Sequence, residues 1–436
     1  MTTLPQGWAS SKLDEVAEFE MGQAPPASTC NMNGEGTIFV KAGEFGPEYP
    51  VVREWTKKPL KFARQGDVLI CVVGATAGKL NLGINCAIGR SVAAIRPFIS
   101  EMQRCIYSQL RQQVMSLRGD STGTAQGVIS KQILADIKIV IPPLVEQKRI
   151  SDKLDIVLGR VDAVNARLAR VAPLLKRFRK SVLSAAHTGQ LLPGSWQDAP
   201  MRKLGDLLSD GPKNGLYKHR SAYGQGTPIL RIDAFYDGRV IGWSSLKQLI
   251  LDDAERAAYR LSNGDIVINR VNSMEYLGKC ALIEGLEDDC VFESNMMRMR
   301  MREYEADSRF IRNWLCSENA KEQIRSKAKQ AVNQASINQT DVLNLELRLP
   351  SLESQVEIVR RVEILFAFAD RLEARLQAAR TAAERLTPAL LAKAFRGELV
   401  PQDPDDEPAA ELLQRLQASQ TAAAPKRGKG KGKAAA

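Results

Sequence analysis

The chain contains a long internal repeat. When the 436-residue sequence is shifted along itself by 208 residues, residues 126–193 and residues 334–401 come into register without a gap. A repeat of this length indicates one structural unit that occurs twice, so any fold inferred for one copy applies to the other. The matched pairs include Gln126 with Gln334, Ile129 with Ile337, Pro142 with Pro350, Gln147 with Gln355, Asp162 with Asp370, Leu168 with Leu376, Gly189 with Gly397 and Leu191 with Leu399.

The segments that precede each copy are related more weakly. LPQGW (4–8) is similar to LPGSW (192–196), KLDEV (12–16) to KLGDL (203–207), and GDVLI (66–70) to GDIVI (264–268). The offsets of these pairs differ from one another, so insertions have accumulated in the variable segments and not in the repeated block. The predicted order is variable (1–143), repeated (144–191), variable (192–350), repeated (351–400) and tail (401–436), and the length also favours more than one core.

Each repeated block carries an apolar heptad pattern. Apolar residues recur at alternating spacings of four and three, and Arg, Glu, Gln and Asp fill the other faces. This is the spacing of the a and d positions of a coiled coil. We predict two long amphipathic helices that pair with each other; packing of each helix on its own domain is the alternative. The positions predicted to pair are Ile150, Leu154, Val157, Val161, Val164, Leu168 and Val171, and Ile358, Val362, Leu365, Ala369, Leu372, Leu376 and Ala379.

Two prolines bear on how far these helices run. From Ile150 to Val171 a helix spans about 33 Å, at about 1.5 Å per residue. The apolar pattern continues through Leu175, but Pro173 should kink or break a helix at this point. Pro388 lies seven residues further along its own copy. The pattern leaves open whether the chain turns back at either proline.

The variable segments differ in character from the repeated blocks. Gly, Pro and Asn separate short runs of β-prone residues, which predict strands at 37–40, 68–73, 229–232 and 266–268. Helical patches interrupt the strands near 100–118 and 307–331, so each variable segment is predicted to be a mixed α/β globule. In the tail, a short helix is expected from about 408 to 420, followed by a disordered basic segment.

Composition narrows the class of protein. With 44% hydrophobic and 25% charged residues the chain is typical of globular proteins, and its apolar runs are too short to span a membrane. The amino terminus has no signal-peptide pattern, so a cytoplasmic location is expected. The seven cysteines form no C-x-x-C pair and are expected to be reduced. Two histidines leave little for a zinc site or for histidine-based catalysis.

The charge balance suits a polyanionic partner. The net charge is +11, and the excess is largest in residues 144–191, which hold 10 basic and 4 acidic side chains. The second variable segment is neutral overall, although positive charge can still gather on one of its faces. A solvated helix face explains each basic cluster equally well, so charge alone does not establish nucleic-acid binding.

Sequence motifs argue against catalysis by this chain. GATAGK (74–79) lacks the four-residue spacing and the final Ser or Thr of a phosphate-binding loop, so we interpret it as a turn. No G-x-G-x-x-G motif follows a predicted strand, and neither H-E-x-x-H nor an adenine-methyltransferase motif occurs. The acidic residues 287–289 are typical of an exposed turn. No catalytic or metal-binding residue is predicted.

The candidate DNA-contacting residues are predicted loop residues whose side chains can form hydrogen bonds with base edges. Arg, Lys, Asn and Gln on loops can form paired hydrogen bonds with guanine or adenine edges. Gln126 and Gln334 fit a structural hydrogen bond equally well, because they occupy matched positions of the repeat. The candidates are Gln23, Lys41, Arg90, Thr124 and Gln126 in the first variable segment, and Lys213, Asn214, Lys218, Arg231, Arg270, Asn272, Asn333 and Gln334 in the second.

Several motifs together resemble a known family. They are GDVLI with the following Gly78 and Lys79, IKIVIPPLVEQKRISDKLD (137–155), LKRFRKSVLSAAHTGQL (175–191), LELRLPSLESQVEIV (345–359) and LLAKAFRGEL (390–399). With these motifs over nearly its whole length, the chain resembles the specificity subunit of Type I restriction-modification enzymes. The second copy has Ser351 and Ser354 where the first has Pro143 and Glu146, which weakens the entry to its helix.

The resemblance implies an α+β fold and a DNA-binding function. Two similar target recognition domains, 1–143 and 192–350, would be separated by two long helices paired as an antiparallel coiled coil with pseudo-two-fold symmetry. Each domain would read one half of a split sequence in double-stranded DNA. Two modification subunits and the restriction subunits would be partners, and S-adenosylmethionine, ATP and Mg would be cofactors of those partners, with none in this chain.

Two alternatives stay open at this stage. A coiled-coil scaffold or adapter without sequence-specific DNA contacts explains the helices but not two large variable globules. A self-contained nuclease or methyltransferase requires catalytic motifs that the sequence lacks.

Overall fold

The structure is a computed structural model that describes residues 4–120, 128–194, 196, 198–331 and 334–423. The chain forms two compact units. The first consists of Met1–Arg167 and Ala379–Ala436, and the second of Leu168–Ala378. Each unit therefore combines one variable segment with parts of both repeated blocks. Over the described residues, no helix combines the length and the apolar character that a membrane crossing requires.

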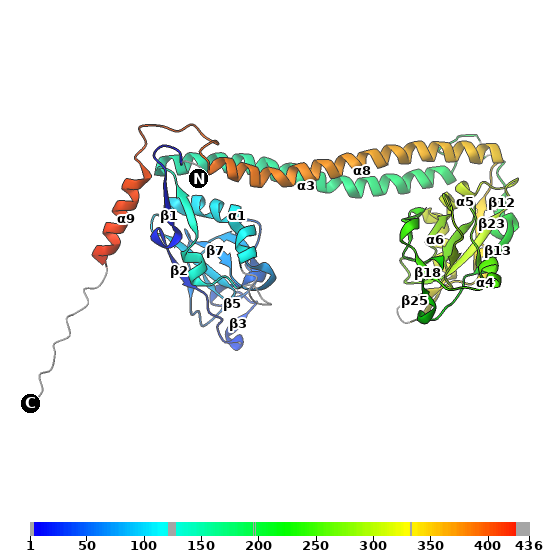
Figure 1. Cartoon of the computed structure of the whole chain (residues 1–436), viewed down its shortest axis with the longest axis horizontal. Coiled ribbons are helices and arrows are strands. Elements are labelled where there is room, and N and C mark those ends of the chain that lie inside the picture. Colours follow the sequence, from blue (N-terminus) through cyan, green and yellow to red (C-terminus); the bar gives the residue numbers. More distant parts are fainter. Residues whose placement is uncertain (1–3, 121–127, 195, 197, 332–333, 424–436) are drawn as a thin grey trace, which may run out of the picture. The chain divides into compact units, whose positions relative to one another are not determined.

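The first unit contains a mixed α/β domain (Figure 1). A four-stranded sheet has the order β2-β10-β7-β8, and a five-stranded sheet has the order β3-β5-β4-β9-β6, in which β4 and β9 are parallel. Strand β1 pairs with β11 next to the start of the long helix. The elements are β1 (Ala9–Lys12), β2 (Ala17–Met21), β3 (Cys30–Asn31), β4 (Thr37–Val40), β5 (Trp55–Thr56), β6 (Phe62–Ala63), β7 (Val68–Cys71), β8 (Leu80–Leu82), β9 (Cys86–Ile88), β10 (Val92–Pro97), α1 (Gln103–Asp120), α2 (Lys131–Ala135) and β11 (Lys138–Ile141).

The second unit repeats this arrangement. Its main sheet runs β13-β23-β19-β21-β17-β16, and its second sheet runs β14-β18-β15-β22 with β15 and β22 parallel. These orders match β2-β10-β7-β8 and β3-β5-β4-β9, so the variable segments share one fold. The strands are β12 (Met201–Lys203), β13 (Leu208–Asn214), β14 (Tyr223–Gly224), β15 (Thr227–Leu230), β16 (Phe235–Tyr236), β17 (Gly238–Val240), β18 (Lys247–Leu249), β19 (Ile266–Asn269), β20 (Val271–Asn272), β21 (Cys280–Leu282), β22 (Val291–Phe292), β23 (Met296–Met301), β24 (Lys329–Ala331), β25 (Gln334–Ser336) and β26 (Glu346–Arg348), and the helices are α4 (Asp253–Tyr259), α5 (Ser308–Leu315), α6 (Glu318–Lys327) and α7 (Gln339–Leu343).

The GDVLI and GDIVI motifs form the same buried ion pair in each domain. A glycine with positive φ, Gly66 or Gly264, allows a tight turn into the central strand. The next residue, Asp67 or Asp265, is buried and accepts two hydrogen bonds from an arginine of the neighbouring strand, Arg96 at 3.0 Å or Arg300 at 2.8 and 3.1 Å. A buried carboxylate requires such a partner, which explains why the motif occurs twice.

The two long helices are α3 (Leu144–His187) and α8 (Leu352–Ala394), and a segment of each lies in each unit (Figure 1). In the first unit, Ile150 and Leu154 of α3 pack with Leu391 and Phe395, at and just beyond the end of α8. Early residues of α3 thus meet late residues of α8, as in an antiparallel pair.

The helix segments of the second unit are also antiparallel. Leu175 of α3 packs with Leu376 of α8. Further along α3, Val182 belongs to the same apolar cluster as Val362, which lies earlier in α8. The predicted fold class, mixed α/β domains with antiparallel paired helices, is confirmed. The predicted domain limits stay predictions.

Neither proline ends its helix. Pro173 was expected to kink or break its helix. It does not break the helix, because α3 continues to His187. In the same way, α8 passes through Pro388 and continues to Ala394. A proline inside a helix costs about 3 kcal/mol. The apolar cluster of the second unit includes Val171 and Ala172 before the proline and Leu175 and Phe178 after it, and this packing offsets the cost.

Most of the predicted pairing positions are buried or half-buried, and two are not. The side chain of Val164 is 45% exposed, and Ala379 is also exposed. These two positions lie outside the apolar clusters, because a straight helix of 3.6 residues per turn drifts away from a strict seven-residue pattern. A further correction concerns residues 329–331, which form β24 and not the end of a helix.

The end of the described chain belongs to the first domain. The tail helix α9 (Ala409–Ala423) places Leu412 and Leu416 in the apolar cluster that contains Leu13 and Ile137. The backbone N–H of Ala409 donates to the carbonyl of Gly7 at 2.8 Å. The expected tail helix is thus found, and its packing against the core is a result that the sequence did not predict. The expected basic disordered segment, residues 424–436, lies outside the described residues.

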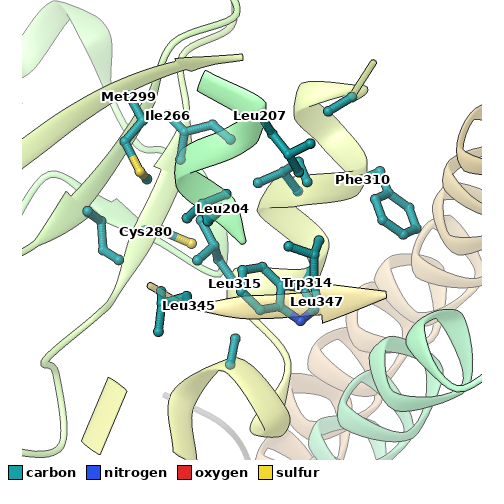
Figure 2. Packing of buried hydrophobic residues seen from close by; sticks show 14 of the residues in the cluster. Leu204, Leu207, Ile266, Cys280, Met299, Phe310, Trp314, Leu315, Leu345 and Leu347 are labelled. Carbon is teal, nitrogen blue, oxygen red and sulfur yellow. The ribbon is translucent and has the colours of Figure 1, made fainter. Parts of the chain in front are cut away.

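The core of the second unit includes one unsatisfied histidine. In Figure 2, Leu204 and Leu207 lie between the sheet and α5, beside Phe310 and Trp314. His187, at the end of α3, packs edge-on against Phe310 with ring centroids 4.8 Å apart. Both ring nitrogens are buried, and neither has a hydrogen-bond partner among the described residues. Burial lowers the pKa of His187 to about 3. The repeat places Phe395, just beyond the end of α8, at the equivalent position.

We expect His187→Phe to reduce the loss of stability in acid. As the pH falls below about 6.5, the unfolded chain binds a proton at this histidine, whereas the folded chain does not until about pH 3. The wild type therefore loses up to about 1.4 kcal/mol per pH unit over this window from this group. Urea unfolding at pH 7, 5 and 4, followed by tryptophan fluorescence, measures the difference. His219→Gln, at an exposed site, is the control, and equal acid losses in the wild type and His187→Phe would contradict the prediction.

Candidate nucleic-acid interface

Three of the predicted DNA-contacting residues of the first domain lie on adjoining backbone segments. Gln23 follows β2, Lys41 follows β4, and Arg90 lies in the turn between β9 and β10. The backbone N–H of Gln23 donates to Ile88 at 3.0 Å, and the N–H of Gly89 donates to Val40 at 2.9 Å. The fold therefore brings together three positions that are far apart in the sequence.

A glycine makes this close approach possible. A Cβ atom at Gly22 would lie 2.2 Å from the carbonyl oxygen of Gly89, a distance that no side chain tolerates. Around it, Gln23 and Arg90 are exposed. Lys41 is half-buried, with its ammonium bonded to Glu54 and 5.6 Å from the ring centroid of Phe39. The bond to Glu54 raises the pKa of Lys41. This cluster presents one amide and two cations.

The second domain builds the same cluster at the equivalent strand ends. Gly215 directly follows Asn214, the last residue of β13, and a Cβ atom at Gly215 would lie 2.1 Å from the carbonyl oxygen of Glu293. The N–H of Gly215 donates to Met296 at 3.0 Å, as Gly22 donates to Val92 at 2.9 Å in the first domain. Arg231 follows β15, as Lys41 follows β4.

Arg270 joins this second cluster from the end of β19. Its guanidinium donates to the carbonyl of Ser294 at 3.2 Å, and its backbone N–H donates to Asn295 at 2.8 Å. Strand β20 follows directly and carries Asn272, which is half-buried and lies opposite Ala335 of β25. Gln334, the first residue of β25, is exposed. Two predicted residues, Asn272 and Gln334, thus lie in one small sheet, β20-β25-β24, and Arg270 directly precedes it.

Charged groups surround Arg231. Its guanidinium lies 4.0 Å from Glu293 and 3.6 Å from Asp233, and donates to the hydroxyl of Tyr223 at 3.4 Å. The Glu293 side chain is buried, and this burial raises the pKa of its carboxyl group. Arg231 is half-buried, so the cluster holds the guanidinium in place while leaving part of it accessible.

Two predicted residues lie in a different place. Lys213 donates to the carbonyl of Ala258 at 2.7 Å, with its ammonium 5.3 Å from the ring centroid of Tyr259. Lys218 forms an ion pair with Glu255 at 2.5 Å. Both lysines thus bind α4 of their own domain. Three further predicted residues, Thr124, Gln126 and Asn333, lie outside the described residues.

Sequence reasoning missed several residues of these clusters. Ser91 accepts a hydrogen bond from the N–H of Ala42 at 3.3 Å, and Glu293, Ser294 and Lys279 surround Arg231 and Arg270. The available signal was the change of offset between the two halves. It is 198 at the GDVLI motif and 208 in the repeated block, so residues have been inserted in the stretch between them, which contains the turns 89–91 and 293–295.

The GATAGK segment is a turn, as predicted. Gly74–Thr76 form a single 3₁₀ turn in the hairpin between β7 and β8, and the N–H of Gly78 donates back to the carbonyl of Cys71 at 2.8 Å. The equivalent Gly278 donates to Asn269 at 3.0 Å. Both glycines have positive φ, which explains why a glycine recurs at this position.

Each of the two domains matches the same known protein family. The family model described as "Type I restriction modification DNA specificity domain" matches the chain twice, over residues 5–172 and 196–379. The chain belongs to this specificity-subunit family. It is a sequence-specific DNA-recognition subunit of a Type I restriction-modification system, and the two matches coincide with the two variable segments and their helices.

Similar sequences agree with this assignment, and solved structures share the fold. The chain is 35% identical over 370 residues to the StySPI specificity subunit of Salmonella potsdam, covering 80% of this chain and 78% of that one. It is 32% identical to the EcoKI specificity subunit of Escherichia coli K12, covering 82% and 80%. The crystal structure of the HsdS subunit from Thermoanaerobacter tengcongensis matches the fold with a TM-score of 0.56 at 19% identity, over 91% of this chain and 98% of that one.

A second solved structure, described as a Type I R-M system in a study of complex assembly, also matches the fold. Its TM-score is 0.72 at 19% identity, and the match covers 91% of this chain and 99% of that chain.

Proposed function

We propose that the two equivalent clusters are the surfaces with which this specificity subunit reads DNA. The first consists of Gln23, Lys41, Arg90 and the turn 89–91, and the second of Asn214, Arg231, Arg270 and the turn 293–295. The observation that carries the proposal is the shared backbone: the close-approach glycine, the strand end that carries Lys41 or Arg231, and the turn 89–91 or 293–295 occur in both domains. The other side chains of the two clusters stand at different positions of this backbone. A shared scaffold with different side chains suits two readers of different half-sites.

Each cluster has the chemistry for base recognition. Arginine pairs with the O6 and N7 atoms of guanine, and asparagine or glutamine pairs with adenine in the major groove. Each cluster offers cations and at least one amide from backbone segments that other strands hold in place. The target is a bipartite sequence in double-stranded DNA, with one half for each domain.

Catalysis belongs to the partners in this proposal. Methyl transfer from S-adenosylmethionine takes place on the modification subunits, and the other partner subunits use ATP and Mg as cofactors. The specificity subunit then works in the cytoplasm as a non-catalytic part of the complex. Purified chain, with and without a modification subunit, tests this division on labelled duplex DNA. We expect methylation only with both proteins present, and preferential binding to one bipartite sequence; equal binding to random DNA would favour the scaffold alternative.

The helices offer a surface for two modification subunits. Ile156 of α3 is 56% exposed, and Ile364 of α8, at the equivalent position of the repeat, is 52% exposed. A large apolar side chain exposed at the same place in both repeats suits a partner present in two copies. We assign these two positions to the modification subunits, one copy at each isoleucine.

We expect Ile156→Asp and Ile364→Asp each to weaken the binding of one modification subunit by at least about tenfold, because a buried carboxylate without a partner is costly. Native mass spectrometry of the reconstituted complex counts the bound copies. The single variants should bind one copy and the double variant none. Gln377→Asp, at an exposed polar position of α8, should bind two copies like the wild type. Two copies on the double variant would exclude this surface.

A further inference from the structure

The loop that carries Arg231 is fixed at one residue, Ile232, through both of its backbone polar groups. Residues 231–234, between β15 and β16, are called the Arg231 loop here. The backbone N–H of Ile232 donates to Oε1 of Glu293 at 2.6 Å. The carbonyl oxygen of the same residue accepts a hydrogen bond from Nζ of Lys279. Two charged side chains from separate strand ends thus satisfy both polar groups of Ile232 (Glu293 follows β22 and Lys279 precedes β21).

Three aromatic rings lie around the ammonium group of Lys279. Its ammonium lies 4.1 Å from the ring centroid of Tyr236, 4.6 Å from that of Phe235 and 5.8 Å from that of Tyr276. Aromatic faces attract a cation, and the attraction grows as water is excluded. Lys279 is half-buried, and this burial lowers its pKa. The rings and the carbonyl of Ile232 together fix the ammonium.

Glu293 is fixed equally well. The residue is only 8% exposed, and its backbone N–H donates to the carbonyl of Leu230 at 3.1 Å. Besides Ile232, the carboxylate faces the guanidinium of Arg231 at 4.0 Å. One buried side chain therefore contacts both the backbone of the loop and its arginine.

In the described part of the first domain (4–120 and 128–143), this arrangement does not occur. Gly89 occupies the position of Glu293, and Lys79, the counterpart of Lys279, is exposed. The loop after Lys41 is stabilised locally, since the N–H of Lys41 donates to Oε2 of Glu44 at 2.9 Å. The double hold on the loop is therefore a property of the second domain, which makes its effect separable from that of the first.

We propose that Lys279 and Glu293 are positioning residues for recognition of the second half-site, holding the Arg231 loop so that its guanidinium meets the DNA in one fixed orientation. The inference rests on the proposed function. A loop ordered before binding loses less entropy on binding, and a bidentate arginine contact tolerates little displacement. Neither positioning residue needs to touch a base.

The experiment uses the full chain reconstituted with its modification subunit. Methylation kinetics are measured on three duplexes: the matched bipartite sequence, a duplex with the first half scrambled, and a duplex with the second half scrambled. The ratio of matched to scrambled rates gives the discrimination for each half. Lys279→Met keeps an apolar chain of similar length but cannot donate to Ile232. We expect it to lower second-half discrimination about tenfold, which corresponds to about 1.4 kcal/mol, because a base contact of Arg231 is then no longer held in place. First-half discrimination and the unfolding midpoint should be unchanged.

Matched variants separate positioning from general damage. Lys79→Met makes the same change in the first domain and should leave both ratios at the wild-type value. Glu293→Ala removes the side-chain oxygen that accepts from the N–H of Ile232, whereas Glu293→Gln retains an amide oxygen that can accept. The Glu293→Ala variant should therefore lose second-half discrimination, and the Glu293→Gln variant should keep most of it. Equal ratios in the wild type and Lys279→Met, or equal losses at both halves, would overturn the inference, as would equal losses in Glu293→Ala and Glu293→Gln.

One further variant distinguishes this inference from the function on which it rests. Arg231→Ala should lose second-half discrimination at least as far as Lys279→Met does. If the wild type discriminates both halves but Arg231→Ala still discriminates the second, the positioning inference is wrong and the proposed function stands. If the wild type discriminates neither half, the proposed function itself fails.

Discussion

Replacing the first variable segment with that of a relative of different specificity is expected to change one half of the recognised sequence completely and the other not at all. The reason is the separate construction of the two readers. The cluster at Gln23, Lys41 and Arg90 is built only from strands of the first domain, and the cluster at Arg231 and Arg270 only from strands of the second. Among the residues that the structure describes, no backbone segment contributes to both clusters, so we expect an exchange of residues 1–143 to leave the second cluster unchanged.

The structure adds one requirement to this exchange. Leu412 and Leu416 of α9 pack in the core of the first domain, and Arg149 of α3 forms an ion pair with Asp406 just before that helix. Residues 401–423 should therefore be exchanged together with residues 1–143. Sequencing of DNA methylated by the reconstituted enzyme gives the new recognition sequence. A change in both halves would rule out independent readers.

Lengthening both helices by one heptad is expected to widen the gap between the two half-sites. Seven helical residues add about 10.5 Å, and DNA rises about 3.4 Å per base pair, so the gap should grow by up to about three base pairs. The insertions belong after Ala166 in α3 and after Ala382 in α8. Both positions lie between the contact of Leu154 with Leu391 and the contact of Leu175 with Leu376, so the register on either side is kept.

Methylation sequencing also measures this spacing. A control that replaces residues 160–166 with the inserted heptad, at constant length, should keep the original gap. Recognition of the original gap by the lengthened protein would show that the helices do not set the separation. The estimate of about 33 Å made from the heptad pattern stays a prediction, because α3 is twice as long as that pattern and its end segments also pack against the domains.

Much of the fold follows from the repeat itself. Gln147 and Gln355 show why the match is informative: each side-chain amide donates to a proline carbonyl five residues earlier, Pro142 or Pro350, at 2.9 Å. An identical local hydrogen bond requires an identical residue, so this constraint is visible in the sequence. The strand at Thr37–Val40, the long helices and the tail helix were predictable for the same reason, since their patterns are local.

The rest of the structure depends on contacts between distant residues. The hold on Ile232 involves Lys279 and Glu293, which are 47 and 61 residues away. Lys279 belongs to the recurring Gly-Lys pair, but the pair does not reveal the contact with Ile232, and Glu293 lies in none of the motifs quoted above. Continuation of α3 through Pro173 depends on packing against α8, which outweighs the local preference of proline. The candidate cluster residues could be chosen by chemical type, but which of them meet, and which bind α4 instead, is decided by tertiary structure.

The most direct test of the central claim, that two equivalent domains read two separate half-sites, is sequencing of methylated bases in the genome of the source organism before and after deletion of the gene for this chain. We predict one bipartite methylated sequence, with two specific parts separated by a gap of fixed length and arbitrary composition, that disappears on deletion. Methylation that depends on this gene but falls in a single uninterrupted sequence would contradict the account.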